Sequence, residues 1–234
     1  MATQETRYIK RHSLQARITH GTVAISCILL AITGLFVFVP ALTALLPAGG
    51  LFAIRMLHRI LGVLFIAVPV ISAIMAPSGV KHMIKIYFPK WDSDDVTWMK
   101  RFVPYMLMPK KVHMPDAHDV KSGQRFADGV LFLAGFMIAI SGIFLVIGTT
   151  FATLPAGLML FMRLMHDVAF VMFAVFGVAH IYLGAGIFQP YRRSHRLMFG
   201  DGMVSESDAM YHWAHWARKE LKSGENVVVV KEEK

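Results

Sequence analysis

The sequence predicts an all-α membrane protein built around a bundle of four transmembrane helices. Of the 234 residues, 56% are hydrophobic, above the roughly 45–50% typical of soluble domains, and the mean hydropathy is positive. A helix needs about 20 mostly apolar residues to cross a bilayer. The segments that meet this requirement are residues 18–39, 51–76, 128–148 and 158–188. This pattern excludes a soluble globular protein.

The first span is not expected to be a cleaved signal peptide. Its apolar region is longer than the usual 7–15 residues, and no A-x-A cleavage site follows it. Pro40 and further apolar sequence follow instead. We therefore expect this segment to remain as the first membrane helix.

Charge placement predicts the orientation of the bundle. Residues 39–51 and 149–158, which connect spans one to two and three to four, carry no Lys or Arg. Basic residues gather at the N-terminus, in residues 77–127 and after the last span. The positive-inside rule then places both termini and the middle segment in the cytoplasm. This asymmetry accounts for the net charge of +9, so nucleic-acid binding is not needed to explain it.

The parts outside the spans are expected to be short elements. Residues 77–127 hold five prolines and mixed charge, which predicts short amphipathic helices broken by turns. We expect a transmembrane domain over residues 1–190 and a cytoplasmic tail over 191–234, with a helix near 207–221. The run Val227–Val230 would be a frayed end or a strand docked on a partner. The single Cys27 excludes a disulfide framework and a cysteine metal cluster.

Histidines inside the spans are the most informative feature. His166 and His180 are fourteen residues apart, which places them within about 40° on one helix face and about 21 Å apart along the axis. His58 starts span two at the depth of His166, and His20 starts span one at the depth of His180. Imidazole is a common axial ligand of haem iron. The depths predict two haem b groups, held by His58 with His166 and by His20 with His180. The other seven histidines are expected to be solvated or capping residues.

Three arginines and one glycine support these pairs. Arg17, Arg55 and Arg163 each precede a candidate ligand by three residues, where they can reach haem carboxylates. The alternative is that they only mark the membrane interface. Gly34 follows His20 by fourteen residues and leaves no side chain at the depth of the other cofactor. Ordinary close packing of small residues is its alternative role.

Several short motifs occur in one order along nearly the whole chain. They are R-x-x-H at 17–20, R-x-L-H at 55–58, G-Q at 123–124, L-x-H-(x13)-H at 164–180, H-x-Y at 180–182, and a tail at 202–205 followed by W-A at 213–214. In these motifs the chain resembles the cytochrome b (gamma) subunit of respiratory formate dehydrogenases. The wider group includes the b-type cytochromes of nickel–iron hydrogenases and thiosulfate reductases. The G-Q pair and the tail favour the formate dehydrogenase branch.

The resemblance implies four transmembrane helices and two b haems. It places the His58/His166 haem nearer the periplasm and the His20/His180 haem nearer the cytoplasm. It also implies a quinone, menaquinone or ubiquinone, beside the second haem, near Lys121, Gly123, Gln124, His180 and Tyr182. Family members often carry Asn where this chain has Lys121. This lysine could contact the quinone oxygen, bind a haem propionate or point to water.

The implied function is electron relay in a multi-pass protein of the bacterial inner membrane. A molybdenum or tungsten catalytic (alpha) subunit would oxidise formate and reduce an iron–sulfur (beta) subunit. This chain would carry the electrons inward and reduce the quinone, so no catalytic residue for formate is expected on it. The complex could also form a higher oligomer.

Two alternatives stay open at this point. The same di-haem cytochrome could serve a hydrogenase or another molybdenum or tungsten oxidoreductase. Alternatively, the chain could be a haem-free transporter or anchor whose histidines relay protons. Against the transporter, we expect no internal repeat and no broken helix of the kind many transporters show.

Overall fold

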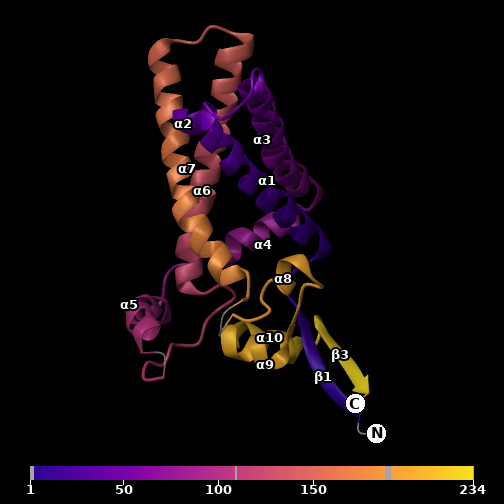
Figure 1. The fold of residues 1–234 in the computed structure, drawn as a ribbon. Helices are drawn as coiled ribbons and strands as arrows, with labels where there is room; N and C mark the ends of the chain where they lie inside the picture. Colours follow the sequence, from indigo (N-terminus) through magenta and orange to yellow (C-terminus); the bar gives the residue numbers. More distant parts are fainter. Residues whose placement is uncertain (1–2, 109, 188–190, 234) are drawn as a thin grey trace. The chain divides into compact units, whose positions relative to one another are not determined.

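The computed structural model describes residues 3–108, 110–187 and 191–233 (Figure 1). Its contacts divide the chain into two compact units. The bundle unit comprises Ile18–Ala76 and Val130–Leu183, and the polar unit comprises the described residues of Met1–Arg17, Pro77–Gly129 and Gly184–Lys234.

The long helices confirm the predicted bundle. Within the described residues, four helices are long and apolar enough to cross a membrane. They are α1 (Leu14–Phe38), α3 (Gly50–Met75), α6 (Ser122–Val146) continued by the π-helix η1 (Ile147–Phe151), and α7 (Ala156–Gly184). The third span starts at Ser122 rather than 128, because the helix continues into polar sequence. The fourth ends at Gly184, and residue 188, the last of the predicted span, lies outside the described residues.

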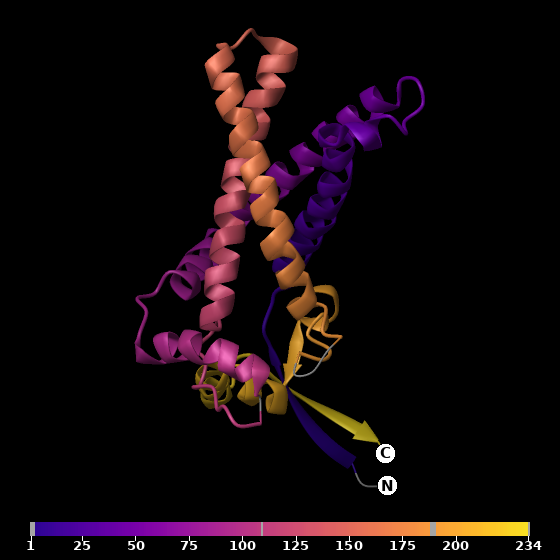
Figure 2. The same ribbon diagram turned by 60° about the vertical axis from the view of Figure 1, so that its left-hand side comes forward.

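Short turns connect the helices at one end of the bundle unit. Helix α2 (Pro40–Thr43) follows α1 and has proline at its first position, where the missing N–H costs nothing. Gly49 then precedes α3 with φ of 78°, a left-handed conformation that glycine adopts without strain. Helices α6 and α7 run side by side as a hairpin in both views (Figures 1 and 2). These turns fix the order in which the four spans meet.

The middle segment contains the predicted short helices. They are α4 (Pro77–Tyr87) and α5 (Ser93–Leu107). Asp92 caps α5 through a capping box with Asp95. Asp95 also forms a buried ion pair with Arg125 at 2.8 Å and accepts a hydrogen bond from Ser122 at 2.7 Å. These contacts fasten α5 to the first turn of α6.

The polar unit also holds a small β-sheet, which the predicted all-α fold did not include. Strand β1 (Thr3–Lys10) pairs antiparallel with β2 (Met203–Ser205) on one side and with β3 (Val227–Glu233) on the other. The run Val227–Val230 is therefore not frayed, because it pairs with this chain's own N-terminal strand; docking of this edge strand on a partner stays a prediction. This pairing puts the first and the last described strand into one sheet of the polar unit, and the orientation of the bundle in the membrane stays a prediction.

The tail folds over this sheet. Helices α8 (Arg196–Phe199), α9 (Glu206–His212) and α10 (Ala214–Ser223) follow one another, so the single helix expected near 207–221 is broken at Trp213. A small buried core joins the strands to the helices and consists of Ile9, Val204, Ala209, Trp213, Trp216 and Ala217. The N-terminal strand thus packs with the tail; the domain division at residue 190 stays a prediction.

Candidate cofactor site

The bundle unit brings the four intramembrane histidines together in two pairs. The ring centroids of His58 and His166 are 6.3 Å apart, and those of His20 and His180 are 6.1 Å apart. Helix α7 supplies one member of each pair, α3 supplies His58 and α1 supplies His20. These are the pairs that the predicted depths give.

The separations match two imidazoles on opposite sides of one metal ion. A metal–imidazole bond is about 2.0–2.1 Å long and the ring centroid lies about 1.1 Å behind the nitrogen, so two axial ligands place their centroids about 6.3 Å apart. Direct stacking of the rings would bring them closer, as it does for His118 and His215 at 4.9 Å. The donor set and its spacing therefore fit a haem iron between the rings of each pair.

A hydroxyl group orients His58 for such a role. Thr33 Oγ1 lies 2.8 Å from His58 Nδ1 and donates its only hydrogen to the Leu29 carbonyl at 2.8 Å. The threonine oxygen must then accept the hydrogen bond from Nδ1–H. This tautomer leaves Nε2 with a free lone pair, as a metal ligand requires.

His166 has the same arrangement. Ser141 Oγ donates to the Met137 carbonyl at 2.6 Å and lies 2.9 Å from His166 Nδ1. A glycine follows each hydroxyl residue: a Cβ on Gly34 would lie 3.4 Å from His58 Cε1, and one on Gly142 would lie 3.6 Å from His166 Cε1. Gly34 is thus at the level of the His58/His166 pair. The two glycines keep the space beside the imidazole rings clear of side chains.

This likeness extends along both halves of the bundle. The numbers of His58 and His166 differ by 108, and the same offset matches many residues of α1 with α6 and of α3 with α7. Identical pairs are Arg17/Arg125, Gly21/Gly129, Ala31/Ala139, Ile32/Ile140, Gly34/Gly142, Phe36/Phe144, Arg55/Arg163, His58/His166, Val63/Val171, Phe65/Phe173 and Val70/Val178. The expectation that the chain has no internal repeat is therefore wrong. The signal was present in I-T-G-L-F and I-S-G-I-F, each followed by R-x-x-H.

The repeat does not extend to the second histidine pair. The offset matches His20 with Asp128 and His180 with Ser72. Ser72 accepts a hydrogen bond from Thr19 at 2.9 Å within the bundle unit. The His58/His166 site is thus built from two equivalent sets of residues. Each half also supplies one histidine to the His20/His180 site, but these two histidines do not stand at equivalent positions of the repeat.

The three arginines differ in their surroundings. Arg17, in the polar unit, donates a hydrogen bond to the Gly200 carbonyl. Arg55 and Arg163 are exposed on α3 and α7, one turn before His58 and His166. Their binding of haem carboxylates stays a prediction.

The residues that the resemblance assigns to a quinone lie in both units. Lys121, Gly123 and Gln124 belong to the polar unit, and His180 and the exposed Tyr182 to the bundle unit. Gly123 has a packing reason to be glycine, because a Cβ there would lie 2.3 Å from the Trp98 ring.

Two polar contacts of these residues were not expected. Gln124 Nε2 donates to Asp128 Oδ2 at 3.2 Å, and the Tyr87 hydroxyl donates to the same oxygen at 2.9 Å. Lys121 Nζ lies 2.8 Å from Nδ1 of His212. His212 was expected to be a solvated or capping residue. It is buried instead, because α9 packs against the sheet.

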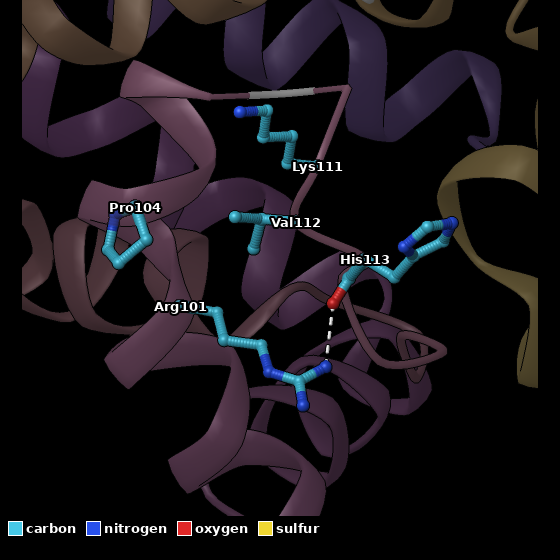
Figure 3. Close-up of a pocket in the computed structure, with 5 residues that line it drawn as sticks. All are labelled: Arg101, Pro104, Lys111, Val112 and His113. Carbon is cyan, nitrogen blue, oxygen red and sulfur yellow. Dashed lines mark hydrogen bonds between the residues drawn. The ribbon is translucent and has the colours of Figure 1, made fainter.

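Other features of the described residues do not suggest a cofactor site beyond the two histidine pairs. Among the residues that the structure describes, no group of three or more His, Cys, Asp or Glu side chains could hold a metal ion. A hollow of about 510 Å³ in the polar unit is lined by Arg101, Pro104, Lys111, Val112 and His113 (Figure 3). Arg101 closes one side of it by donating to the His113 carbonyl at 2.7 Å. None of the predicted site residues lines this hollow.

Four apolar helices with paired histidines at the spacing of axial ligands define a membrane protein of the cytochrome b class. The chain matches the family model described as prokaryotic cytochrome b561 over residues 11–200, and it belongs to this family. The match includes all four membrane helices and all four intramembrane histidines. The chain is thus a membrane electron-transfer protein that binds haem b. No curated protein matches it.

Proposed function

We propose that this chain is the di-haem cytochrome b subunit of a membrane-bound formate dehydrogenase. In this role it takes electrons from a periplasmic iron–sulfur subunit and reduces a quinone on the cytoplasmic side. The observation that carries the proposal is the presence of two histidine pairs, at 6.3 and 6.1 Å, with one member of each on α7. Their fourteen-residue spacing sets the two sites about 21 Å apart along the helix.

The protein's contribution is ligation, orientation and separation. Haem supplies reversible one-electron chemistry when it is bound. His58 and His166 would hold one group, and His20 and His180 the other. Thr33 and Ser141 fix the tautomer of the first pair, which prepares Nε2 for the iron without a rearrangement. Because α7 is a continuous helix, the separation of the two sites does not depend on a flexible loop.

The finer parts of the proposal come from the sequence motifs. The G-Q pair at 123–124 and the tail at 202–205 favour formate dehydrogenase over the related hydrogenase and thiosulfate reductase cytochromes. The quinone, menaquinone or ubiquinone, would be bound near Lys121, Gly123, Gln124, His180 and Tyr182. The connections between spans one and two and between spans three and four lack Lys and Arg, so the positive-inside rule predicts that they face the periplasm. This orientation supports the inward direction of electron flow.

Haem stoichiometry tests the central claim. A dithionite-reduced minus oxidised spectrum of the purified protein should give two haem b per chain. His180→Ala should lose one haem and quinone reduction but keep the other, while His82→Ala, at an exposed position on α4, should keep both. A folded wild-type preparation without haem would refute the proposal and favour a proton-relay transporter.

The electron donor needs its own test. In membranes that contain the assembled complex, formate should reduce both haems, and His58→Ala should prevent reduction of the remaining haem by formate. Reduction by hydrogen but not by formate would assign the cytochrome to a hydrogenase. Full turnover of His58→Ala would contradict the order of the two sites.

A further inference from the structure

A lysine and a histidine meet in the interior of the polar unit. Lys121 immediately precedes α6, and its Nζ lies 2.8 Å from Nδ1 of His212 at the end of α9. The Tyr191 ring covers this pair, since it stacks on His212 at 5.2 Å with an interplanar angle of 13°. Lys121 Nζ lies 4.5 Å from the centroid of the same ring and 3.5 Å from its hydroxyl. Aromatic rings thus replace water around the lysine.

The charge that acts on Lys121 comes from Arg11, which itself faces the carboxylates of Asp119 and Glu220. The Arg11 guanidinium lies 3.9 Å from the Trp213 ring, and Lys121 Nζ lies 5.8 Å from a ring of the same residue. Arg11 donates to the Asp119 carbonyl. Among the described residues, the contacts of Lys121 are with an imidazole, a phenol and aromatic rings, and none is with a carboxylate. The charged form of Lys121 is therefore disfavoured.

Lys121 titrates near neutral pH while the groups around it do not. Burial and the nearby Arg11 charge lower the pKa of Lys121 to about 7. Burial lowers the pKa of Arg11 only to about 10, so it stays charged. Burial raises the pKa of Tyr191, and a hydrogen bond with Tyr211 on α9 raises the pKa of Tyr105 to about 12. The phenols therefore stay protonated, and the proton that exchanges at neutral pH belongs to Lys121.

We propose that Lys121 and His212 form a proton-carrying pair that supplies protons for the reduction of the quinone. This inference rests on the proposed function, in which the quinone accepts two electrons delivered through this chain and two protons. In each delivery, an N–H bond of the Lys121 ammonium breaks and an O–H bond forms on the reduced quinone. The neutral amine is then reprotonated through the neutral His212 imidazole: Nδ1 passes a proton to Nζ while the other ring nitrogen takes one from solvent, so the pair never carries two protons.

A purely structural lysine would behave differently. If Lys121 only anchors α9 against α6, an arginine at this position should preserve the contact to the aromatic rings and the activity. An arginine cannot release a proton near neutral pH. Lys121→Arg and Lys121→Met therefore separate the two roles, and Lys100→Met, at an exposed position on α5, is the matched control.

The first readout is independent of activity. The fluorescence of the four tryptophans should be titrated from about pH 6 to about pH 9, which brackets the pKa of Lys121. The wild type should show a transition near pH 7, because charging Lys121 changes the field at Trp213. Lys121→Met should lose this transition and Lys100→Met should keep it. Its persistence in Lys121→Met would overturn the inference.

The second readout is the oxidation of the dithionite-reduced full-length protein in membranes by a water-soluble naphthoquinone, followed by the haem absorbance. The wild-type rate should fall as pH rises through the transition. Lys121→Met and Lys121→Arg should be slower by at least about tenfold at neutral pH, with flat pH profiles and unchanged haem content. Wild-type rates and pH profiles in both variants would overturn the inference alone. If the quinone fails to oxidise the wild type, the proposed quinone reduction fails as well.

Discussion

Ser141 offers a direct test of how the chain prepares a haem ligand. The proposed change is Ser141→Ala, which removes the oxygen that lies 2.9 Å from His166 Nδ1. Loss of a hydrogen bond to a metal-ligating histidine typically costs 10–100-fold in metal affinity. This range equals about 1.4–2.7 kcal/mol. We therefore expect the haem to be retained but held more weakly.

The electronic effect should be easier to measure than the affinity. The Nδ1–H bond makes the imidazole a stronger donor and favours ferric over ferrous iron. A tenfold loss of this preference raises a one-electron midpoint potential by about 59 mV. A redox titration followed by haem absorbance should show two waves, of which only one moves upward in Ser141→Ala.

Two further variants make this test specific. Ser141→Thr keeps the hydroxyl, as Thr33 does at the equivalent position, and should leave both potentials near their wild-type values. Ser26→Ala removes a buried serine of α1 that the structure does not place at any described histidine. If Ser141→Ala leaves both potentials unchanged, or moves both equally, the proposed orientation of His166 is incorrect.

Three other predictions follow from the geometry. Gly34→Leu should lower the haem content from two to one, measured by pyridine haemochrome, because its side chain would enter the space beside His58, where a Cβ alone lies 3.4 Å from the ring. Asp95→Asn should destabilise the protein by about 3–5 kcal/mol in thermal or denaturant unfolding, because it leaves the Arg125 guanidinium buried without its partner. Lys121→Met should raise thermal stability most at acidic pH. The pKa of Lys121 is lowered from 10.5 to about 7 on folding, so its destabilising effect is full below pH 7 and disappears as pH rises to about 10.5.

These three predictions have distinct contrary results. Two haems in Gly34→Leu would mean that the cofactor does not occupy the space beside this glycine. An unchanged unfolding midpoint for Asp95→Asn would show that water reaches Arg125. A stability difference for Lys121→Met that is constant over pH would mean that the folded protein does not depress the pKa of this lysine.

The bundle could be predicted from the sequence because lipid imposes simple requirements. Apolar length defined the spans, and helix rise together with depth placed His58 opposite His166 and His20 opposite His180. These rules act locally or within one helix. They do not depend on side-chain packing, so they hold without knowledge of the rest of the fold.

The polar unit was harder to predict because its contacts are distant in sequence. Strand β1 consists mostly of polar and charged residues, and its partners β2 and β3 lie about two hundred residues away in the sequence. His212 appeared to be a solvated histidine of a polar tail, and only the packing of α9 shows that it is buried. The hydroxyls of Thr33 and Ser141 were overlooked because apolar helices often contain such residues without a specific role.

The broken symmetry of the bundle gives its two histidine pairs different surroundings. Where the halves agree, they provide the same histidine, hydroxyl and glycine twice. Where they diverge, Asp128 stands at the position that matches His20, and Ser72 at the position that matches His180. A repeated two-helix unit can thus hold two sites with the same kind of ligand and still give each site its own environment, by keeping the residues around one pair and varying those around the other.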